Sequence, residues 1–473
     1  MWRQKALYFL LFGGMACAWP WLPLLSEKRY GLGSAAVSRL AAARTLTGAL
    51  VAPLWGAAAD ATGWHPRLHA LSLTTSALVR LALALAPPAC GEATLLALVI
   101  ASEALGAAAT CLADGSTNAA LERAGMPLGA YGRQRLWGAI GWGWVFAPLS
   151  GAIIADLGEE TRWVATFGLH VGVIFVTAAL ALTLDHTTPA AWRSAMLKRK
   201  RSDDELAAFG GARGAPAAPS SSARRMARVL RHPRVALTYA AFFLAASFMG
   251  MVETYLFLYL DMLGGTTLLM GLALTFTCLS EVAIFFYAER IMDALGNDRS
   301  ITFVFVCFAA RFGLYGVLPV LGSPWIVLPV QLLHGITFGL FYAVGQRFTH
   351  TAAPAGLEAT CQGLLNGCVS GGMFTGALLL GWPFVWDPQR TWLVLAGIAL
   401  CAAPIFYAAA SSLMPLGDRR GTVLAARGGD VRGGGGRTKG PVFFGGDDEE
   451  EEEEEAAGLL LMAEDLDIDE TGL

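Results

Sequence analysis

Three ionisable residues lie near the middle of three successive apolar segments in the second half of the chain: Glu281, Arg311 and His334. A charged side chain at the centre of a bilayer costs about 2.5–3.5 kcal/mol on insertion scales. We therefore expect the acid, the guanidinium and the imidazole to be functional residues. Together they suit a polar relay through which a proton passes. The alternative is a static buried triad that orders the second half of the protein.

Apolar segments of about 20 residues recur along most of the chain, and each is long enough to cross ~30 Å of hydrocarbon. The chain has 473 residues, of which 55% are hydrophobic and 15% charged, whereas soluble domains carry about 25% charged residues. We predict an all-α membrane protein with twelve transmembrane helices. The twelve segments cover approximately 6–25, 37–59, 68–86, 93–113, 136–155, 163–184, 235–260, 268–288, 301–321, 325–345, 359–384 and 391–413.

One long connection, rich in Arg, Lys, Ser, Ala, Gly and Pro, divides the segments into six and six. We predict a six-helix bundle over 1–184, a disordered linker over 185–234, a second six-helix bundle over 235–413 and a disordered acidic tail over 414–473. Lys and Arg gather in the even-numbered loops and at both termini. The positive-inside rule therefore predicts that both termini and the linker are cytoplasmic.

Several classes of protein are disfavoured. The eight cysteines show no C-x-x-C pair and no Cys/His ligand spacing, so we expect no metal site. No Walker motif is present, which argues against an ATP-driven pump. No hydrolase constellation lies outside the apolar segments, so we expect neither an enzyme nor a cofactor.

The second segment ends in Gly56-Ala-Ala-Ala-Asp60, followed by Gly63 and Arg67. This stretch resembles the loop motif of the major facilitator superfamily between its second and third helices. The resemblance implies that Gly56 allows close helix packing and that Asp60 bonds a neighbouring helix end or a cytoplasmic arginine. The match is partial, since Ala61 follows the acid where a basic residue is usual. The alternative is a glycine-rich helix end with a capping aspartate.

A more specific stretch opens the fifth segment: Tyr131-Gly-Arg-Gln-Arg-Leu-Trp-Gly138. It resembles the signature of the branch that holds the major facilitator superfamily domain-containing protein six group and the bacterial oligosaccharide– and nucleoside–proton symporters. Arg133 and Arg135 then belong to the conformational motif; alternatively they only anchor the helix end. Further matches are His232-Pro233, Ser280-Glu281-Val282, Ala310-Arg311-Phe312, Leu333-His334-Gly335-Ile336-Thr337-Phe338 and Ala359-Thr360-Cys361-Gln362-Gly363.

The resemblance covers about 5–413 and implies two six-helix bundles with a solute site near the membrane midplane. In that fold the first, fourth, seventh and tenth helices line the cavity. Glu103 and Glu253 are therefore candidate ligands of the solute, with Arg44 or Arg80 as a partner, and the ring of Tyr255 is a candidate stacking surface. The alternatives are structural ion pairs for the charges and an interfacial anchor for the tyrosine.

Among the bacterial relatives, proton-coupled lactose permeases carry a Glu, an Arg and a His on the eighth, ninth and tenth helices. They also carry a Glu one turn beyond the His as the main protonation site. This chain has Thr337 there. The resemblance therefore points to Glu281 as the proton carrier, with His334 second and Arg311 as the counter-charge.

We expect a secondary transporter that moves a small polar solute by alternating access, with proton symport. The alternatives are a facilitative uniporter and a non-transporting receptor or scaffold. The expected partners are the solute, a proton and the lipid bilayer of the plasma membrane or an endomembrane. We expect a monomer and no nucleic-acid partner. In the tail, Glu455-Ala-Ala-Gly-Leu459-Leu460 has the form of an acidic dileucine sorting signal, unless this segment is only a solvated tail.

Overall fold

The computed structural model describes residues 1–126, 131–184, 231–352, 358–381 and 383–413. The predicted sorting signal at Glu455, Leu459 and Leu460 lies outside the described residues, as does nearly all of the predicted linker. The secondary structure over the described residues is entirely helical. Residues 1–416 form one compact unit.

The N-terminal half contains the first six predicted segments as helices, some of them broken. The first segment consists of α1, a short 3-10 turn and α2, and the fourth and fifth segments are also divided. The elements are α1 (Trp2–Ala16), η1 (Trp19–Trp21), α2 (Leu22–Lys28), α3 (Ser34–Thr62), α4 (His65–Leu85), α5 (Glu92–Gly106), α6 (Ala108–Arg123), α7 (Tyr131–Ala139), η3 (Ile140–Phe146), α8 (Ala147–Asp156) and α9 (Glu159–Leu182).

The C-terminal half contains the last six predicted segments. The π-helical stretches η5 and η6 interrupt the tenth and eleventh, as η3 interrupts the fifth. The elements are α12 (Pro233–Met262), α13 (Thr267–Leu321), η4 (Pro324–Ile326), α14 (Val327–Gln331), η5 (Gly335–Leu340), α15 (Phe341–Ala352), α16 (Glu358–Thr375), η6 (Gly376–Leu380), η7 (Pro383–Val385) and α17 (Pro388–Ser412).

The helix α13 contains two spans, because Gly296 has φ 76° and ψ 163° and turns the chain back on itself. That positive φ is a conformation that glycine adopts at little cost. By length and apolar composition, nine described helices suit a membrane span, and the bent pair 324–331 and 335–349 makes a tenth. The turn at Gly296 divides one of these into two, and α3, with 29 residues, occupies the second predicted position. Helices therefore stand at all twelve predicted positions.

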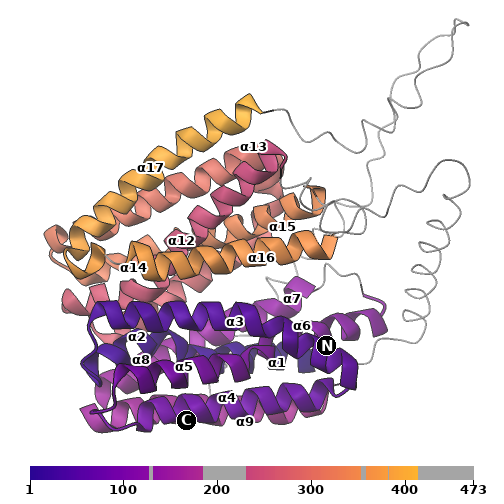
Figure 1. Ribbon diagram of the computed structural model, residues 1–473, viewed down its shortest axis with the longest axis vertical. Coiled ribbons are helices and arrows are strands. Elements are labelled where there is room, and N and C mark those ends of the chain that lie inside the picture. Colours follow the sequence, from indigo (N-terminus) through magenta and orange to yellow (C-terminus); the bar gives the residue numbers. More distant parts are fainter. Residues whose placement is uncertain (127–130, 185–230, 353–357, 382, 414–473) are drawn as a thin grey trace, which may run out of the picture. The chain divides into compact units, whose positions relative to one another are not determined.

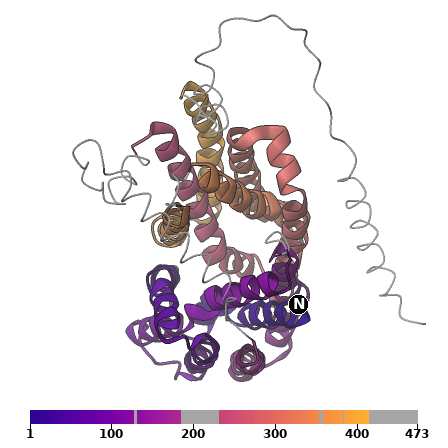
Figure 2. The same cartoon turned by 90° about the vertical axis from the view of Figure 1, so that its right-hand side faces the viewer.

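The helices of each half group together (Figures 1 and 2). In Figure 1 the indigo and purple helices of the N-terminal half lie below, and the pink, orange and yellow helices of the C-terminal half lie above. This is the predicted arrangement of two six-helix bundles. We call the end with residues 29–33, 86–91, 157–158 and 263–266 the odd-loop end, and the end with residues 63–64 and the turn at Gly296 the even-loop end.

Two pairs of helices join the halves at close range. A Cβ atom at Gly151 on α8 would lie 2.4 Å from the carbonyl oxygen of Thr267 on α13, so the two backbones touch there. The hydroxyl of Thr275 also donates to the carbonyl oxygen of Gly143, at 2.6 Å. Between α3 and η6, the hydroxyl of Ser38 donates to the carbonyl oxygen of Ala377, at 2.7 Å. Small residues allow this close approach, which is typical of helix packing in membranes.

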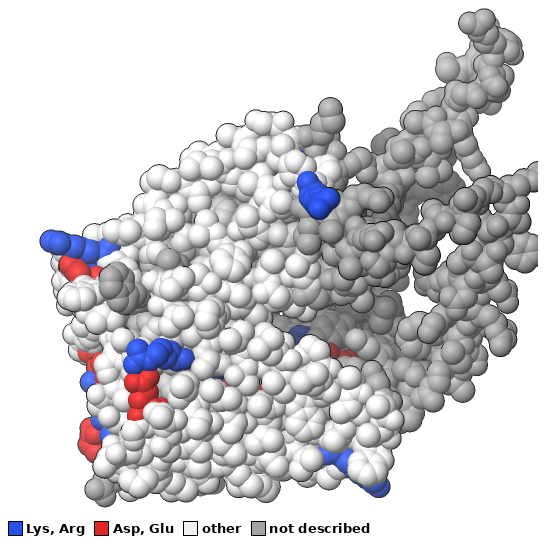
Figure 3. Space-filling view, viewed as in Figure 1, with Lys and Arg blue, Asp and Glu red and all other residues white. Residues whose placement is uncertain are grey.

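The outer surface is apolar across its middle. Figure 3 shows one face on which charged side chains gather toward the two ends and uncharged side chains cover most of the area between them. Large apolar side chains point outward, such as Val320 with 79% of its surface exposed and Ile405 with 66%. A surface of this kind is satisfied in a bilayer and costly in water.

Candidate functional site

The tenth segment is broken beside His334. The α14 helix ends at Gln331, η5 begins at Gly335, and the two parts are bent by 41°. At the break, the backbone N–H of Gly335 donates to the hydroxyl of Ser280 on α13, at 3.0 Å. A Cβ atom at position 335 would lie 2.4 Å from the carbonyl oxygen of Ser280, so glycine permits this approach. The break thus fixes the tenth segment against the first part of α13.

Arg311 is buried, with 1% of its surface exposed, and its guanidinium is surrounded by neutral partners. Nη2 donates to Oε1 of Gln331 at 2.7 Å, Nε donates to the hydroxyl of Tyr315 at 2.7 Å, and Nη1 donates to the hydroxyl of Thr337 at 3.0 Å. Nη1 also lies 3.2 Å from Nδ1 of His334. A guanidinium has no acceptor, so Nδ1 accepts this hydrogen bond and His334 is neutral, with its proton on Nε2.

Glu281 does not join Arg311 and His334. Within the described residues it makes no hydrogen bond or ion pair with either of them, and the positive charge that acts on its carboxyl group is Arg135 from the N-terminal half. Four of the five N–H groups of Arg311 already have a partner in Gln331, Thr337, Tyr315 or His334. The prediction of one three-membered cluster was therefore wrong for Glu281, whereas the structure does bring Arg311 and His334 together.

A second polar cluster surrounds Arg135 and includes residues that the sequence did not single out. The hydroxyls of Tyr8 and Tyr131 both donate to Oδ1 of Asp114, at 2.7 and 2.8 Å. The guanidinium of Arg135 lies 3.8 Å from the ring centroid of Phe12 and 5.5 Å from that of Tyr8. These contacts join the first, fourth and fifth segments. Tyr131 and Arg135 belong to the motif that opens the fifth segment, and Tyr8 in a strongly apolar first segment was a further signal for this site in the sequence.

The cluster reaches across to the C-terminal half. Arg135 acts electrostatically on Glu281 of α13 and on Tyr342 of α15, and Asp114 also acts on Tyr342. We call the three charged residues Asp114, Arg135 and Glu281 the polar line. It runs from the N-terminal half to the C-terminal half and alternates acid, base and acid.

Two further ion pairs lie beside Trp19. Arg80 Nη2 lies 3.3 Å from Glu103 Oε1, and both residues are buried. Arg44 Nη2 lies 3.5 Å from Glu253 Oε2, and this pair joins the two halves. The guanidinium carbons of Arg44 and Arg80 each lie 5.4 Å from the ring centroid of Trp19. Of the two partners predicted for Glu103, the structure selects Arg80.

The space beside Trp19 is small. Trp19, Arg44 and Glu253 line a cavity of about 20 Å³, which has room for about one water molecule. In this conformation the cavity is too small for a solute. Within each of the two ion pairs beside Trp19, the acid and the base contact each other and so join two helices.

Two predicted site residues have other surroundings than expected. Tyr255 is fully buried, its hydroxyl donates to the carbonyl oxygen of Ala377 at 3.1 Å, and its ring centroid lies 4.6 Å from that of Phe384. Its ring therefore packs inside the C-terminal half, and the prediction of a solute-stacking surface was wrong for this structure. A Cβ atom at Gly56 would meet nothing within 4 Å. The close packing predicted for that glycine is absent here.

The remaining motif residues are Asp60 and Arg133. The side chain of Asp60 lies outside the described residues. Arg133 is exposed near the start of α7, whereas Arg135, two residues later, belongs to the polar line.

The two halves are joined toward the odd-loop end. Lys28 at the end of α2 forms an ion pair with Asp261 at the end of α12. The hydroxyl of Thr267 donates to the carbonyl oxygen of Gly151, at 2.8 Å. With the Ser38 contact and the pair of Arg44 and Glu253, these interactions link four helix pairs across the halves. The conformation is therefore closed toward the odd-loop end.

Comparison with known proteins identifies the fold. The model of the MFS_1 like family matches residues 1–394. The chain belongs to this family of the major facilitator superfamily. It is a multi-pass membrane transporter with the twelve-helix fold that the sequence predicted, and it is not an enzyme.

Individual members of the superfamily are similar over different lengths. The maltose permease of Geobacillus stearothermophilus is 26% identical over 364 residues, which are 77% of this chain and 82% of that protein. The major facilitator superfamily domain-containing protein 6-like protein B of Xenopus laevis is 24% identical over 152 residues, 31% of this chain and 24% of that protein. The crystal structure of the nucleoside transporter NupG has a TM-score of 0.69 at 17% identity, covering 86% of this chain and 98% of that chain.

Proposed function

We propose that this MFS_1 like transporter carries a small, uncharged polar solute across a membrane together with a proton, and that Glu281 carries the proton. The observation that supports the proposal is the polar line, in which the positive charge of Arg135, from the other half, acts on the carboxyl group of Glu281. An opposite charge favours the ionised form of a carboxyl group, and burial without that charge favours the neutral form. Motion of one half against the other therefore changes which form Glu281 prefers.

The surroundings of the polar line suit a solute with several hydroxyl groups. Asp114 and Glu281 offer acceptors, Arg135 offers fixed donors, and Tyr342 of the C-terminal half offers a hydroxyl. The relatives named for maltose and nucleosides make sugars and nucleosides the first solutes to test.

Arg311 has a different role in this proposal. Its guanidinium organises Gln331, Thr337 and His334 around the break in the tenth segment, and through Gly335 this break is fixed to the helix that carries Glu281. Arg311 and His334 thus position the C-terminal side of the site, and neither needs to bind the proton.

The decisive experiment reconstitutes the full-length protein in proteoliposomes and measures uptake from a panel of sugars and nucleosides, with and without an imposed pH gradient. We expect one class of solute to accumulate above its external concentration when the gradient is present. Equilibration that ignores the gradient would identify a uniporter. No uptake of any solute would identify a receptor or scaffold.

We further propose that both termini are cytoplasmic, that the even-loop end faces the cytoplasm and that the protein acts as a monomer in the plasma membrane or an endomembrane. The distribution of Lys and Arg supports this orientation. Epitope tags at the two termini, probed with antibody before and after the membrane is made permeable, test it. Staining of intact cells at either terminus would contradict the orientation.

A further inference from the structure

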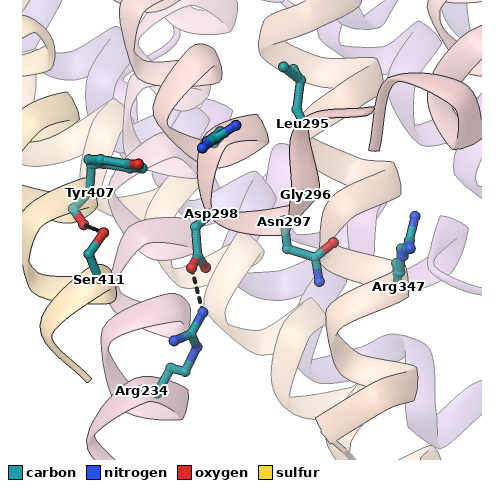
Figure 4. A pocket seen from close by; sticks show the side chains of 9 residues that line it. Arg234, Leu295, Gly296, Asn297, Asp298, Arg347, Tyr407 and Ser411 are labelled. Carbon is teal, nitrogen blue, oxygen red and sulfur yellow. Dashed lines mark hydrogen bonds and ion pairs between the residues drawn. The ribbon is translucent and has the colours of Figure 1, made fainter. Parts of the chain in front are cut away.

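A larger cavity lies at the even-loop end of the C-terminal half, and none of the polar-line residues lines it (Figure 4). Its volume is about 450 Å³, which is within the range of small-molecule sites. It is formed by the start of α12, the turn within α13, the end of α15 and the end of α17. Its polar and glycine lining residues include Arg234, Gly296, Asn297, Asp298, Arg299 and Arg347.

The three arginines in this lining differ in their partners. Arg234 forms an ion pair with Asp298, and its Nη1 also donates to the carbonyl oxygens of Ala410 and Leu413, each at 3.2 Å. Arg347 Nη1 lies 2.6 Å from Asp293 Oδ1. Arg299 is exposed and makes no ion pair or hydrogen bond with any other described residue. The cavity therefore carries one guanidinium that no described acid neutralises.

The floor of the cavity leaves room for a ligand. The chain turns at Gly296 with φ 76°, and a Cβ atom at that position would meet nothing within 4 Å. The side-chain amide of Asn297 follows directly and supplies neutral donors. In Figure 4, the side chains of Arg234 and Asp298 lie on one side of the turn and that of Arg347 lies on the other. An anion above the turn would thus have guanidinium groups on both sides.

We propose that this cavity binds a phosphate-bearing anion. The planar guanidinium fork matches phosphate oxygens, and Arg299 supplies a charge that no described residue pairs. Basic pockets between membrane helices are typical sites for anionic lipid headgroups. The same chemistry would accept either the headgroup of an anionic phospholipid or a soluble phosphate ester. The experiment separates these two sources.

The test measures binding to purified full-length protein in detergent by titration of intrinsic tryptophan fluorescence. The probes are dioctanoyl phosphatidylinositol bisphosphate, inositol trisphosphate and dioctanoyl phosphatidylcholine. The test variant is Arg299→Gln, which removes no ion pair or hydrogen bond to a described residue. The matched control is Arg67→Gln, because Arg67 is also exposed at the even-loop end but belongs to the other half.

We expect an inositol-bearing probe to bind and the choline lipid not to bind. In Arg299→Gln the affinity falls about fivefold, since a basic residue near the membrane surface contributes about that much, and in Arg67→Gln it is unchanged. If the inositol lipid binds and inositol trisphosphate does not, the cavity is a site for a lipid headgroup. If both bind with equal affinity, the cavity is a site for a soluble phosphate ester. The proposal is overturned if neither inositol-bearing probe binds more tightly than the choline lipid. It is also overturned if Arg299→Gln and Arg67→Gln weaken the binding of that probe equally.

Discussion

Nη1 of Arg311 lies 3.2 Å from Nδ1 of His334, so this imidazole accepts a hydrogen bond from a permanent cation. Binding a second proton at Nδ1 would remove the acceptor and place two positive charges side by side. The pair therefore holds His334 in its neutral form, which supports the proposal that Glu281 carries the proton.

The first prediction concerns His334→Gln, whose side-chain oxygen can replace the lost acceptor. We expect proton-driven accumulation to persist with a rate reduced by no more than about tenfold, because the glutamine oxygen keeps much of a hydrogen bond to a charged donor that contributes about 1.5–3 kcal/mol. Uptake into proteoliposomes under an imposed pH gradient measures this. If accumulation disappears while exchange at equal concentrations remains, His334 and not Glu281 carries the proton.

The second prediction concerns Glu281→Gln, which keeps the size of the side chain but cannot ionise. We expect accumulation under a pH gradient to be lost and exchange at equal solute concentrations on both sides to remain, because exchange needs no net proton movement. Glu92→Gln is the matched control, since Glu92 pairs with Arg39 of the same half, outside the polar line. Undiminished accumulation in Glu281→Gln would rule out the assignment.

The third prediction concerns the buried pair of Arg80 and Glu103. Because each single substitution, Arg80→Gln or Glu103→Gln, leaves the other charge buried and unpaired, we expect each to destabilise the protein by about 3–5 kcal/mol. The double variant should lose less free energy of unfolding than the sum of the losses in the two single variants. Thermal unfolding of the four purified proteins measures this coupling. Strictly additive losses would show that the two side chains act separately.

The fourth prediction concerns closure of the odd-loop end. A short thiol cross-linker between Ser38→Cys and Ala377→Cys should join α3 to η6 and stop transport, because alternating access requires the halves to separate there. A cleavable linker should restore uptake when it is cut. The controls are the two variants that carry only one of the introduced cysteines, which report any cross-linking to the eight native cysteines. Full transport by the cross-linked protein would show that this end stays closed throughout the cycle.

The fifth prediction compares two glycines in helices. A Cβ atom at Gly376 would lie 1.9 Å from the carbonyl oxygen of Ser247, whereas one at Gly172 would meet nothing within 4 Å. We expect Gly376→Ala to destabilise the protein by about 1–3 kcal/mol through overpacking. Gly172→Ala should be neutral or slightly stabilising. Thermal unfolding compares them, and equal stability of the two variants would contradict the tight contact between α12 and η6.

Much of the fold could be predicted from the sequence, because the thickness of a bilayer sets the length of every apolar segment. The direction in which a side chain points from its helix could not be predicted. Successive residues are rotated by about 100° around the helix axis, so a small error in register changes the neighbours of a side chain. Glu281, Arg311 and His334 each lie near the middle of an apolar segment, yet the positive charge that acts on Glu281 is that of Arg135. The burial of Tyr255 likewise depends on Phe384 and Ala377, which are distant in the chain.

Three helices that hold the site contain π-helical turns: η3 in the fifth segment, η5 in the tenth and η6 in the eleventh. Such a turn holds one residue more than an α-helical turn. When the extra residue moves one turn along its helix, the side chains that it passes rotate by about 100° while both helix ends stay in place. The residues between the halves thus have a means of changing direction by local slippage, separate from any rocking of the two bundles.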